Sequence, residues 1–320
     1  MDKVRGKLVA DFGNALVTTT PGGPLRNLGM LSVGFDSGPG PVSLGEVVYT
    51  APDFYTVRAG VVEFPPGRAL TGQELTSLAS APVVLFHTTP NGDTVLVASE
   101  GNDGLYIRAD ANVFRINPGG KAVVELRASK FGEPLGSAQV GLALTTGQMD
   151  PSAFPLNTPP GACSFPAQVV TDATGKALVE ITATDPGTPR NYIDGQVYGV
   201  GYGLTAAGQG ASTPNPWDFV SVLIFTHTAF PTAPTWLGDV QPVLQQFQNL
   251  YPRMGKILKL GEYDSVVANL AGLRSVFTLD KANPNYMPAT RDLSASKLAM
   301  ILAWMDTKGP DGKPLMGTGA

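Results

Sequence analysis

Short apolar runs alternate with turn sequences along the first third of the chain. Residues 83–86 and 94–97 flank a segment that contains Asn91 and Gly92, a composition typical of a hairpin loop. We expect residues 105–108 to form a further hairpin arm, and apolar positions spaced at three and four predict a short helix within residues 72–80. The pattern predicts a β-rich domain that covers residues 1–115.

Strict alternation of apolar and polar positions is clearest in the middle of the chain. We expect five strands, at residues 122–128, 140–144, 178–183, 197–204 and 219–226, of which 122–128 and 178–183 alternate in the manner of half-buried strands. We expect the first two to be neighbours, a turn with Asp172 and Gly175 to precede the third, and Trp217 to lie at the entry of the last. This order of strands and turns resembles bacterial immunoglobulin-like domains. It predicts an immunoglobulin-like β-sandwich over residues 116–230.

After residue 230 the period of the apolar positions changes from two to about 3.6 residues, which predicts helices. We expect Asp239 to cap a first helix with a buried face that ends at Leu250, and a second helix to span residues 263–277. Ser294 is placed to cap a third. The fold class is therefore mainly β, with a C-terminal three-helix module at residues 231–308 and a flexible tail at residues 309–320.

Composition and charge exclude several classes of protein. The formal net charge is -4 and the pI is near 5.2, so there is no broad cationic surface for nucleic acid. No apolar run approaches the roughly 20 residues that span a bilayer, and no signal-peptide pattern follows Met1. We therefore expect no membrane span, and a cytoplasmic protein unless a leader was removed before residue 1.

Few side chains are candidates for chemistry. His87 and His227 are the two histidines, and both lie at the ends of apolar strands. Each is a candidate ligand for haem or iron, and the competing interpretation is a histidine that a backbone carbonyl satisfies. Cys163 lies in the Pro- and Gly-rich segment 149–166, a candidate binding or packing loop, and acts as a nucleophile only if a histidine reaches it. No catalytic residue and no metal site is predicted.

Two unusual motifs stand in the helical region. The first is Tyr251-Pro252-Arg253-Met254, and the second runs from Tyr286 through Met287, Pro288, Ala289, Thr290, Arg291, Asp292 and Leu293 to Ser294. Together, and strongest over residues 236–305, they resemble the chromopyrrolate synthase family, also described as iminophenylpyruvate dimer synthases, of violacein and rebeccamycin biosynthesis. That resemblance implies oxidative coupling of indole-derived imines by haem- or iron-associated proteins that carry a ferritin-like domain after this region.

The sequence departs from that family in one respect that bears on catalysis. A ferritin-like di-iron site needs Glu-x-x-His pairs, and the sequence contains none. Arg291 and Asp292 have two interpretations, a site for a substrate carboxylate or a fastening of the loop to the open carbonyls of a helix end. Tyr286 and Met287 also have two interpretations: they either contact the face of a flat cofactor or fill the core.

Three functions follow, in order of preference. The first is a non-catalytic structural or accessory subunit of an oxidoreductase-type enzyme assembly, with a catalytic subunit or a second copy of the chain as its partner. The second is a haem- or iron-binding oxidative coupling enzyme. The third is a surface or adhesive β-sandwich protein.

Overall fold

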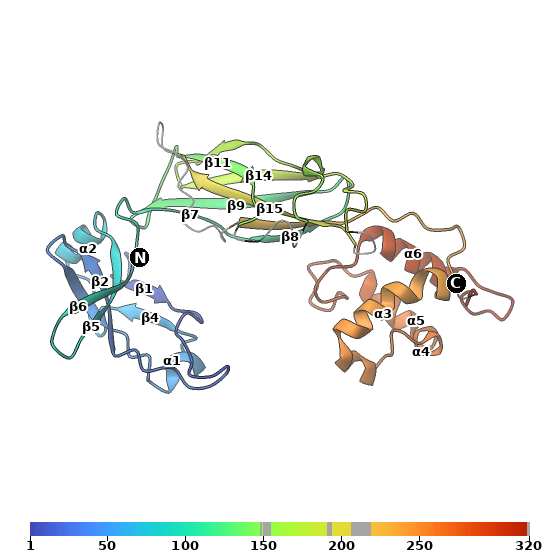
Figure 1. Cartoon of the computed structure of the whole chain (residues 1–320), viewed down its shortest axis with the longest axis horizontal. Coiled ribbons are helices and arrows are strands. Elements are labelled where there is room, and N and C mark those ends of the chain that lie inside the picture. Colours follow the sequence, from blue (N-terminus) through green and yellow to red (C-terminus); the bar gives the residue numbers. More distant parts are fainter. Residues whose placement is uncertain (148, 150–154, 191–193, 206–218, 319–320) are drawn as a thin grey trace.

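The computed structural model describes residues 1–147, 149, 155–190, 194–205 and 219–318. These residues form an N-terminal β module, a β-sandwich and a C-terminal helical module, each with its own buried core. The sandwich lies between the other two (Figure 1). The mainly β fold class is therefore confirmed. Among the described residues, every helix is too short or too polar to reach across a bilayer.

The N-terminal module is built on a four-stranded antiparallel sheet in the order β3-β2-β5-β6. Its strands are β2 (Met30–Asp36), β3 (Pro41–Glu46), β5 (Val83–Thr88) and β6 (Thr94–Ser99). Beside it lie the pair β1 (Leu8–Asp11) and β4 (Val61–Phe64), with α1 (Asp53–Thr56) and α2 (Gly72–Leu78). The predicted hairpin is confirmed, with Gly92 at positive φ, and so is the helix within 72–80. Thr71 and Glu74 form a capping box for that helix.

The β-sandwich consists of two five-stranded sheets. The first contains β7 (Leu105–Ala109), β9 (Lys121–Lys130), β10 (Glu133–Pro134), β12 (Cys163–Ser164) and β14 (Lys176–Ala183). The second contains β8 (Val113–Ile116), β11 (Gln139–Leu144), β13 (Gln168–Val170), β15 (Gln196–Leu204) and β16 (Phe219–Ile224). A 3-10 turn, η1 (Pro160–Ala162), leads into β12. The five predicted strands are all present.

Two predictions about the sandwich are wrong. Residues 105–108 are not a hairpin arm of the first module, because β7 pairs with β9 and Ile107 is buried in the sandwich core. The sandwich therefore begins near residue 105 rather than at 116. Strand β11 is not a neighbour of β9 but lies in the opposite sheet, between β13 and β15. Alternation shows which side of a strand is buried but does not show which strand lies beside it.

The turn before β14 has the predicted chemistry. The Asp172 carboxylate accepts hydrogen bonds from the backbone N–H groups of Thr174 and Lys176, and Gly175 has φ +77°. A Cβ at Gly175 would lie 2.3 Å from the Ala128 carbonyl oxygen, so only glycine fits. Trp217 and part of the 149–166 segment lie outside the described residues.

The helical module contains α3 (Gln241–Leu250), α4 (Tyr263–Ala268), α5 (Leu270–Phe277) and α6 (Ala295–Asp306), with a π-helical turn η2 (Trp236–Val240) and a 3-10 turn η3 (Pro252–Lys256). Ser294 caps α6 as predicted. Asp239 is not the first cap, because the helical turn begins earlier and Thr235 accepts from the Gly238 N–H. The second predicted helix is divided at Asn269, whose side chain donates to the Ser265 carbonyl.

The predicted flexible tail is also wrong for the described residues up to 318. The Leu315 carbonyl accepts hydrogen bonds from the Trp236 N–H and from the Trp304 indole, each at 2.9 Å. Tyr263 donates its hydroxyl to the Pro314 carbonyl at 2.5 Å. These carbonyls satisfy buried donors of the helical core, so the segment is part of that core.

The N-terminus of α6 lies against one end of the sandwich. The Ala295 N–H donates to the Asn117 side-chain oxygen at 2.8 Å, and Thr228 N–H donates to the Ser296 hydroxyl at 3.1 Å. Lys297 pairs with Asp194 at 3.2 Å, and the two side chains are only 14% and 13% exposed. The sandwich therefore supplies both an additional cap and a counter-charge to this helix.

Candidate functional site

The helical module has an apolar groove of about 420 Å³ between α3, α5 and the loop before α6. Its lining is almost entirely hydrocarbon and thioether, from Leu244, Phe247, Tyr251, Met254, Ile257, Leu258, Leu260, Leu273, Val276, Phe277, Met287, Pro288 and Ala289, with Asn269 and Gly272. The amide of Asn269 already donates to Ser265. We call this surface the apolar groove.

The first motif forms one wall of the groove by ending α3. Residues before proline avoid the helical region, and Tyr251 has φ -123° and ψ 65°. Pro252 then starts the 3-10 turn, as proline does in the first helical turn. The chain changes direction there, which places Tyr251 and Met254 on the groove.

The second motif forms the facing wall and is tied to the first. The Met287 N–H donates to the Val276 carbonyl of α5 at 3.2 Å. The Tyr251 and Thr290 hydroxyls are 2.8 Å apart, and Thr290 donates to the Asp292 carboxylate at 2.5 Å. The two motifs, about 35 residues apart in sequence, therefore meet around one cavity.

The loop that carries the second motif is held by Arg291. Its guanidinium donates to the carbonyls of Lys281 at 3.1 Å and Asn283 at 2.9 Å, and also to Ala289. It also lies over the Tyr286 ring, 5.8 Å from the centroid. Tyr286 itself is buried, and burial raises the pKa of its phenol. Arg291 and Tyr286 thus support the loop from behind, while Met287 and Pro288 line the groove.

The sequence did not identify the margin of the groove. Leu250 was expected on the buried face of the first helix, but it is 62% exposed because the chain turns away at Pro252 and leaves it uncovered. Ile257 is 81% exposed at the same margin. Ile257 follows directly after Lys256 and falls outside any periodic pattern of apolar residues. Its position was the sequence signal that could have identified this margin.

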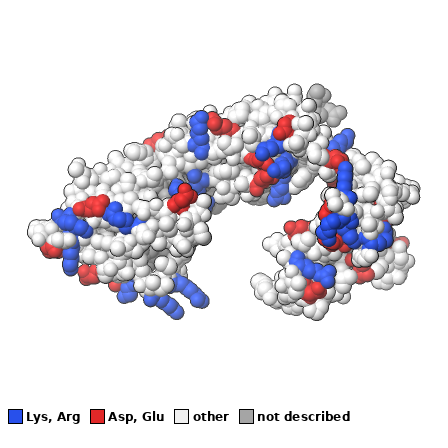
Figure 2. Space-filling view, turned by 180° about the vertical axis from the view of Figure 1, so that it is seen from behind, with Lys and Arg blue, Asp and Glu red and all other residues white. Residues whose placement is uncertain are grey.

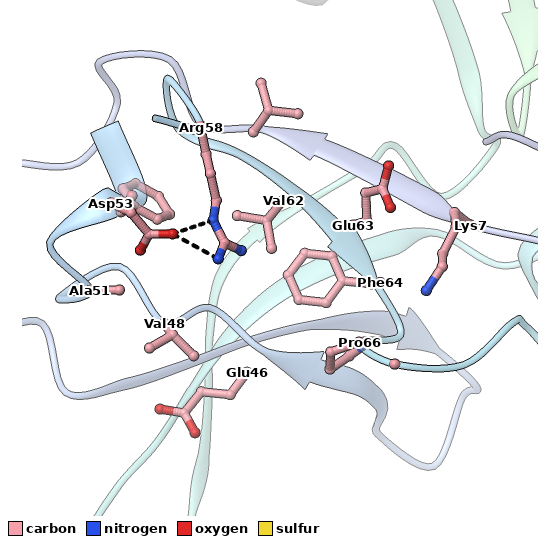
Figure 3. A pocket seen from close by; sticks show the side chains of 13 residues that line it. Lys7, Glu46, Val48, Ala51, Asp53, Arg58, Val62, Glu63, Phe64 and Pro66 are labelled. Atoms are coloured by element: carbon pink, nitrogen blue, oxygen red, sulfur yellow. Dashed lines mark hydrogen bonds and ion pairs between the residues drawn. The ribbon is translucent and has the colours of Figure 1, made fainter. Parts of the chain in front are cut away.

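A second cavity, of about 700 Å³, lies in the N-terminal module beside β3, β4 and α1 (Figure 3). Among the described residues, its charged groups other than Glu46 have partners: the Arg58 guanidinium is 2.8 Å from Asp53, and Lys7 donates to the carbonyls of Pro65 and Arg68 at 2.6 and 2.7 Å. Glu63 pairs with Arg5 at 2.7 Å. These charges hold local structure together, so the cavity is a weaker candidate than the apolar groove.

The N-terminal module also has an exposed strand edge. Within the described sheet, β6 hydrogen-bonds only to β5. All six of its residues are exposed, and three of them, Val95, Leu96 and Val97, are consecutive apolar residues about half exposed. Because consecutive side chains point to opposite faces, both faces of β6 are apolar. An uncharged open edge of this kind readily pairs with another strand.

The predicted cofactor ligands do not come together. His87 lies on β5 of the first module, with a buried Nδ1 atom that has no hydrogen-bond partner among the described residues. His227 is an exposed residue after β16 in the sandwich, and its backbone N–H donates to the Asp185 carboxylate at 3.3 Å. Over the residues that the structure describes, no three His, Cys, Asp or Glu side chains are grouped for a metal ion.

Cys163 is buried on β12 in the sandwich core, and burial raises the pKa of its thiol to about 11. A thiol with that pKa is almost entirely protonated at neutral pH. Cys163 therefore packs in the sandwich core, and β12 is held there by its pairing with β14.

The charged side chains of the described residues form no large patch of one sign on the face drawn in Figure 2. Figure 2 shows blue and red residues interspersed over the face in view. This face therefore offers no continuous cationic path for a nucleic-acid backbone.

No protein-family model matches the sequence, and no curated protein does. Among solved structures, the D00-D0 domain of intimin is similar over 69% of this chain and 83% of that chain, with 10% identity and a TM-score of 0.26. The Yersinia pseudotuberculosis adhesin InvE aligns with 66% of this chain and 52% of that chain, at 12% identity and a TM-score of 0.24. Domains 4 and 5 of the S-layer protein SbsC align with 45% of this chain and 63% of that chain, at 11% identity and a TM-score of 0.23. TM-scores this low establish neither a common family nor a common function.

Proposed function

We propose that this chain is a non-catalytic binding protein of the surface or adhesive kind, in which an immunoglobulin-like sandwich separates two recognition modules. One observation carries the proposal: each end module has its own core and still leaves apolar side chains uncovered, on both faces of the edge strand β6 in the first and in the apolar groove in the last. Uncovered apolar surfaces of this kind mark sites of protein interaction.

A second candidate is a structural or accessory subunit of an oxidoreductase assembly. It is favoured by the convergence of Tyr251, Met254, Met287 and Pro288 on the groove, because these residues carry the resemblance to the chromopyrrolate synthase family. Both candidates attribute the function to binding rather than to turnover. They differ in the partner, which is a cell-surface component in the first case and a redox enzyme in the second.

The test is partner capture from the native source with the full-length chain and three variants. V95K/V97K alters β6, L250S/I257S alters the groove margin, and V123S is the control at an exposed valine of the sandwich. We expect the first or second variant to lose the captured partner and the control to keep it. The absorption spectrum and metal content of that partner then separate the two candidates. Turnover by the purified chain alone, or capture unaffected by both variants, would contradict the proposal.

A further inference from the structure

We propose that the apolar groove binds an amphipathic α-helix of a partner protein, with acidic residues beside its apolar stripe. This inference rests on the proposed function and names the partner class of one of its two surfaces. It depends on three features of the groove: its continuity with exposed apolar residues, its few polar groups, most of which already have partners, and the charges on its margin.

The groove is not a closed cavity. Tyr251, Met254 and Ile257 line both the groove and a shallower hollow that also includes Leu250. The apolar surface therefore continues from the buried floor to side chains that are mostly exposed. A small ligand would leave this outer part uncovered, whereas a helix that presents residues at i, i+3/i+4 and i+7 would cover the floor and the margin together.

The polar groups of the groove favour a helix over an extended peptide or a small polar ligand. A peptide that binds as an added strand needs a sheet edge for its own N–H and C=O groups, and this groove is formed by helices and turns. A small-molecule site usually offers a few convergent polar groups, but here the Asn269 side-chain NH2 and the Tyr251 and Thr290 hydroxyls are already engaged, which leaves the Asn269 side-chain oxygen as an isolated acceptor among the described residues. A helix satisfies its own backbone and needs only apolar contact.

The charges on the margin indicate an acidic partner. Arg253 and Lys256 lie on the 3-10 turn beside Met254 and Ile257, and neither pairs with a carboxylate in the described part of the chain. Nearby Lys259 differs, because its ammonium is 2.9 Å from Glu262. Two unpaired cations at the rim of an apolar surface favour carboxylates that flank an apolar stripe. The two methionines on the walls, Met254 and Met287, suit a partner surface of varied shape.

The test uses fluorescein-labelled peptides of about 18 residues, a length sufficient for an amphipathic groove-binding helix. The first has leucines at helical spacing flanked by glutamates, the second replaces the glutamates by lysines, and the third replaces the leucines by serines. Fluorescence anisotropy is measured with the full chain. We expect saturable binding of the first peptide, with affinity at least about tenfold weaker for the second and third.

Variants of the chain locate the binding. Ile257→Ser should weaken binding at least about fivefold, and Arg253→Glu with Lys256→Glu should reverse the preference between acidic and basic peptides. Ile257 is mostly exposed, so its substitution leaves the core intact, and circular dichroism checks this. Val123→Ser and Lys130→Glu, at exposed positions of the sandwich, are the matched controls and should change nothing.

Three results would overturn the inference: no saturable binding of the acidic peptide, equal binding of the basic one, or binding unaffected by Ile257→Ser. Displacement of the peptide by a small apolar acid at lower concentration than by unlabelled peptide would also overturn it, in favour of a ligand pocket. If these results appear while β6 variants still abolish partner capture, the groove inference fails and the proposed function stands.

Discussion

The two ends of the sandwich can be compared through the contacts that they make with the neighbouring modules. At the helical end, Asn117 accepts from Ala295, and the Lys297–Asp194 pair is mostly removed from solvent. At the other end, Lys3 pairs with Glu133 at 2.6 Å, but the side chains are 61% and 41% exposed. Charge pairs lose strength with solvent exposure, so similar distances correspond to different energies.

This difference indicates how freely each end module can move relative to the sandwich. Partly buried polar contacts have few alternative partners, so we expect the helical module and the sandwich to move as one body. An exposed pair exchanges readily with water and salt, and it constrains the N-terminal module less. The groove would then keep a defined orientation relative to the sandwich, whereas β6 would adopt a wider range of orientations.

The largest expected effect comes from the pair at the helical junction. Lys297→Met keeps most of the side-chain volume but removes the ion-pair partner of the Asp194 carboxylate, which then has only its weaker interaction with the Arg190 guanidinium. We expect a loss of about 1–3 kcal/mol in the unfolding free energy of the helical module, less than the roughly 3–5 kcal/mol typical of a fully buried pair. Calorimetry together with hydrogen exchange in α6 measures it. Lys313→Met, at an exposed lysine of the same module, is the control, and an equal effect there would contradict the assignment.

The next effect concerns the cap that the sandwich supplies to α6. Asn117→Ala removes the acceptor for the Ala295 N–H and should cost about 1 kcal/mol, as the loss of a helix cap does. Asn117→Asp keeps an acceptor and adds negative charge near a helix N-terminus, so its stability should match or exceed that of Asn117. Hydrogen exchange in the first turn of α6 distinguishes the two. If both substitutions destabilise equally, the cap is not the cause.

A smaller effect is expected inside the N-terminal module, away from its junction. Hydrogen bonds from Arg68, and from the Thr71 N–H, lower the pKa of Glu74 to about 2. The pKa of Glu74 in the folded protein therefore lies below its ordinary value of 4.5. The ionised Glu74 carboxylate stabilises the fold fully above about pH 4.5, and this stabilisation is lost as the pH falls toward 2. Glu74→Gln should therefore cost roughly 0.5–1 kcal/mol at neutral pH and progressively less in acid.

Urea unfolding of the wild type and the Glu74→Gln variant at several pH values measures this difference, and hydrogen exchange locates it. A pH-independent difference would show that the Glu74 charge is not responsible. Exchange should rise in α2 and stay unchanged near Lys3, because this substitution loosens the module without touching its junction.

The smallest effect is expected at the N-terminal junction itself. Lys3→Ala removes the exposed pair with Glu133 and should change the unfolding free energy by less than about 0.5 kcal/mol. Small-angle scattering at low and high salt measures the spread of module orientations, which we expect to be broad and little affected by the substitution. A stability loss as large as that of Lys297→Met would show that the two junctions are equivalent.

Local patterns predicted the elements better than they predicted their neighbours. The strands of the sandwich, the hairpin β5–β6, the Asp172 turn and the Ser294 cap each depend on residues within a few positions of one another, and all are confirmed. The placement of β7 and β11 failed because several strands of similar alternation compete for each edge. Asp239 was chosen as a cap because it precedes an apolar pattern, but the π-helical turn begins at Trp236.

The candidate site was predictable only in part. The two motifs were visible as unusual sequences, but nothing local showed that Tyr251 and Thr290 would meet at 2.8 Å or that Met254 and Met287 would share one cavity. The exposure of Leu250 and Ile257 also depends on which neighbours the tertiary structure provides.

By itself the sequence determined the mainly β class, the change to helices after residue 230 and most turns and caps, because periodicity and turn chemistry act over a few residues. Only the tertiary structure decided the partners of each strand, the docking of the C-terminal segment, the buried pair between Asp194 and Lys297 and the apolar groove. These depend on contacts between residues far apart in sequence, for which burial and shape, rather than local preference, select the partner.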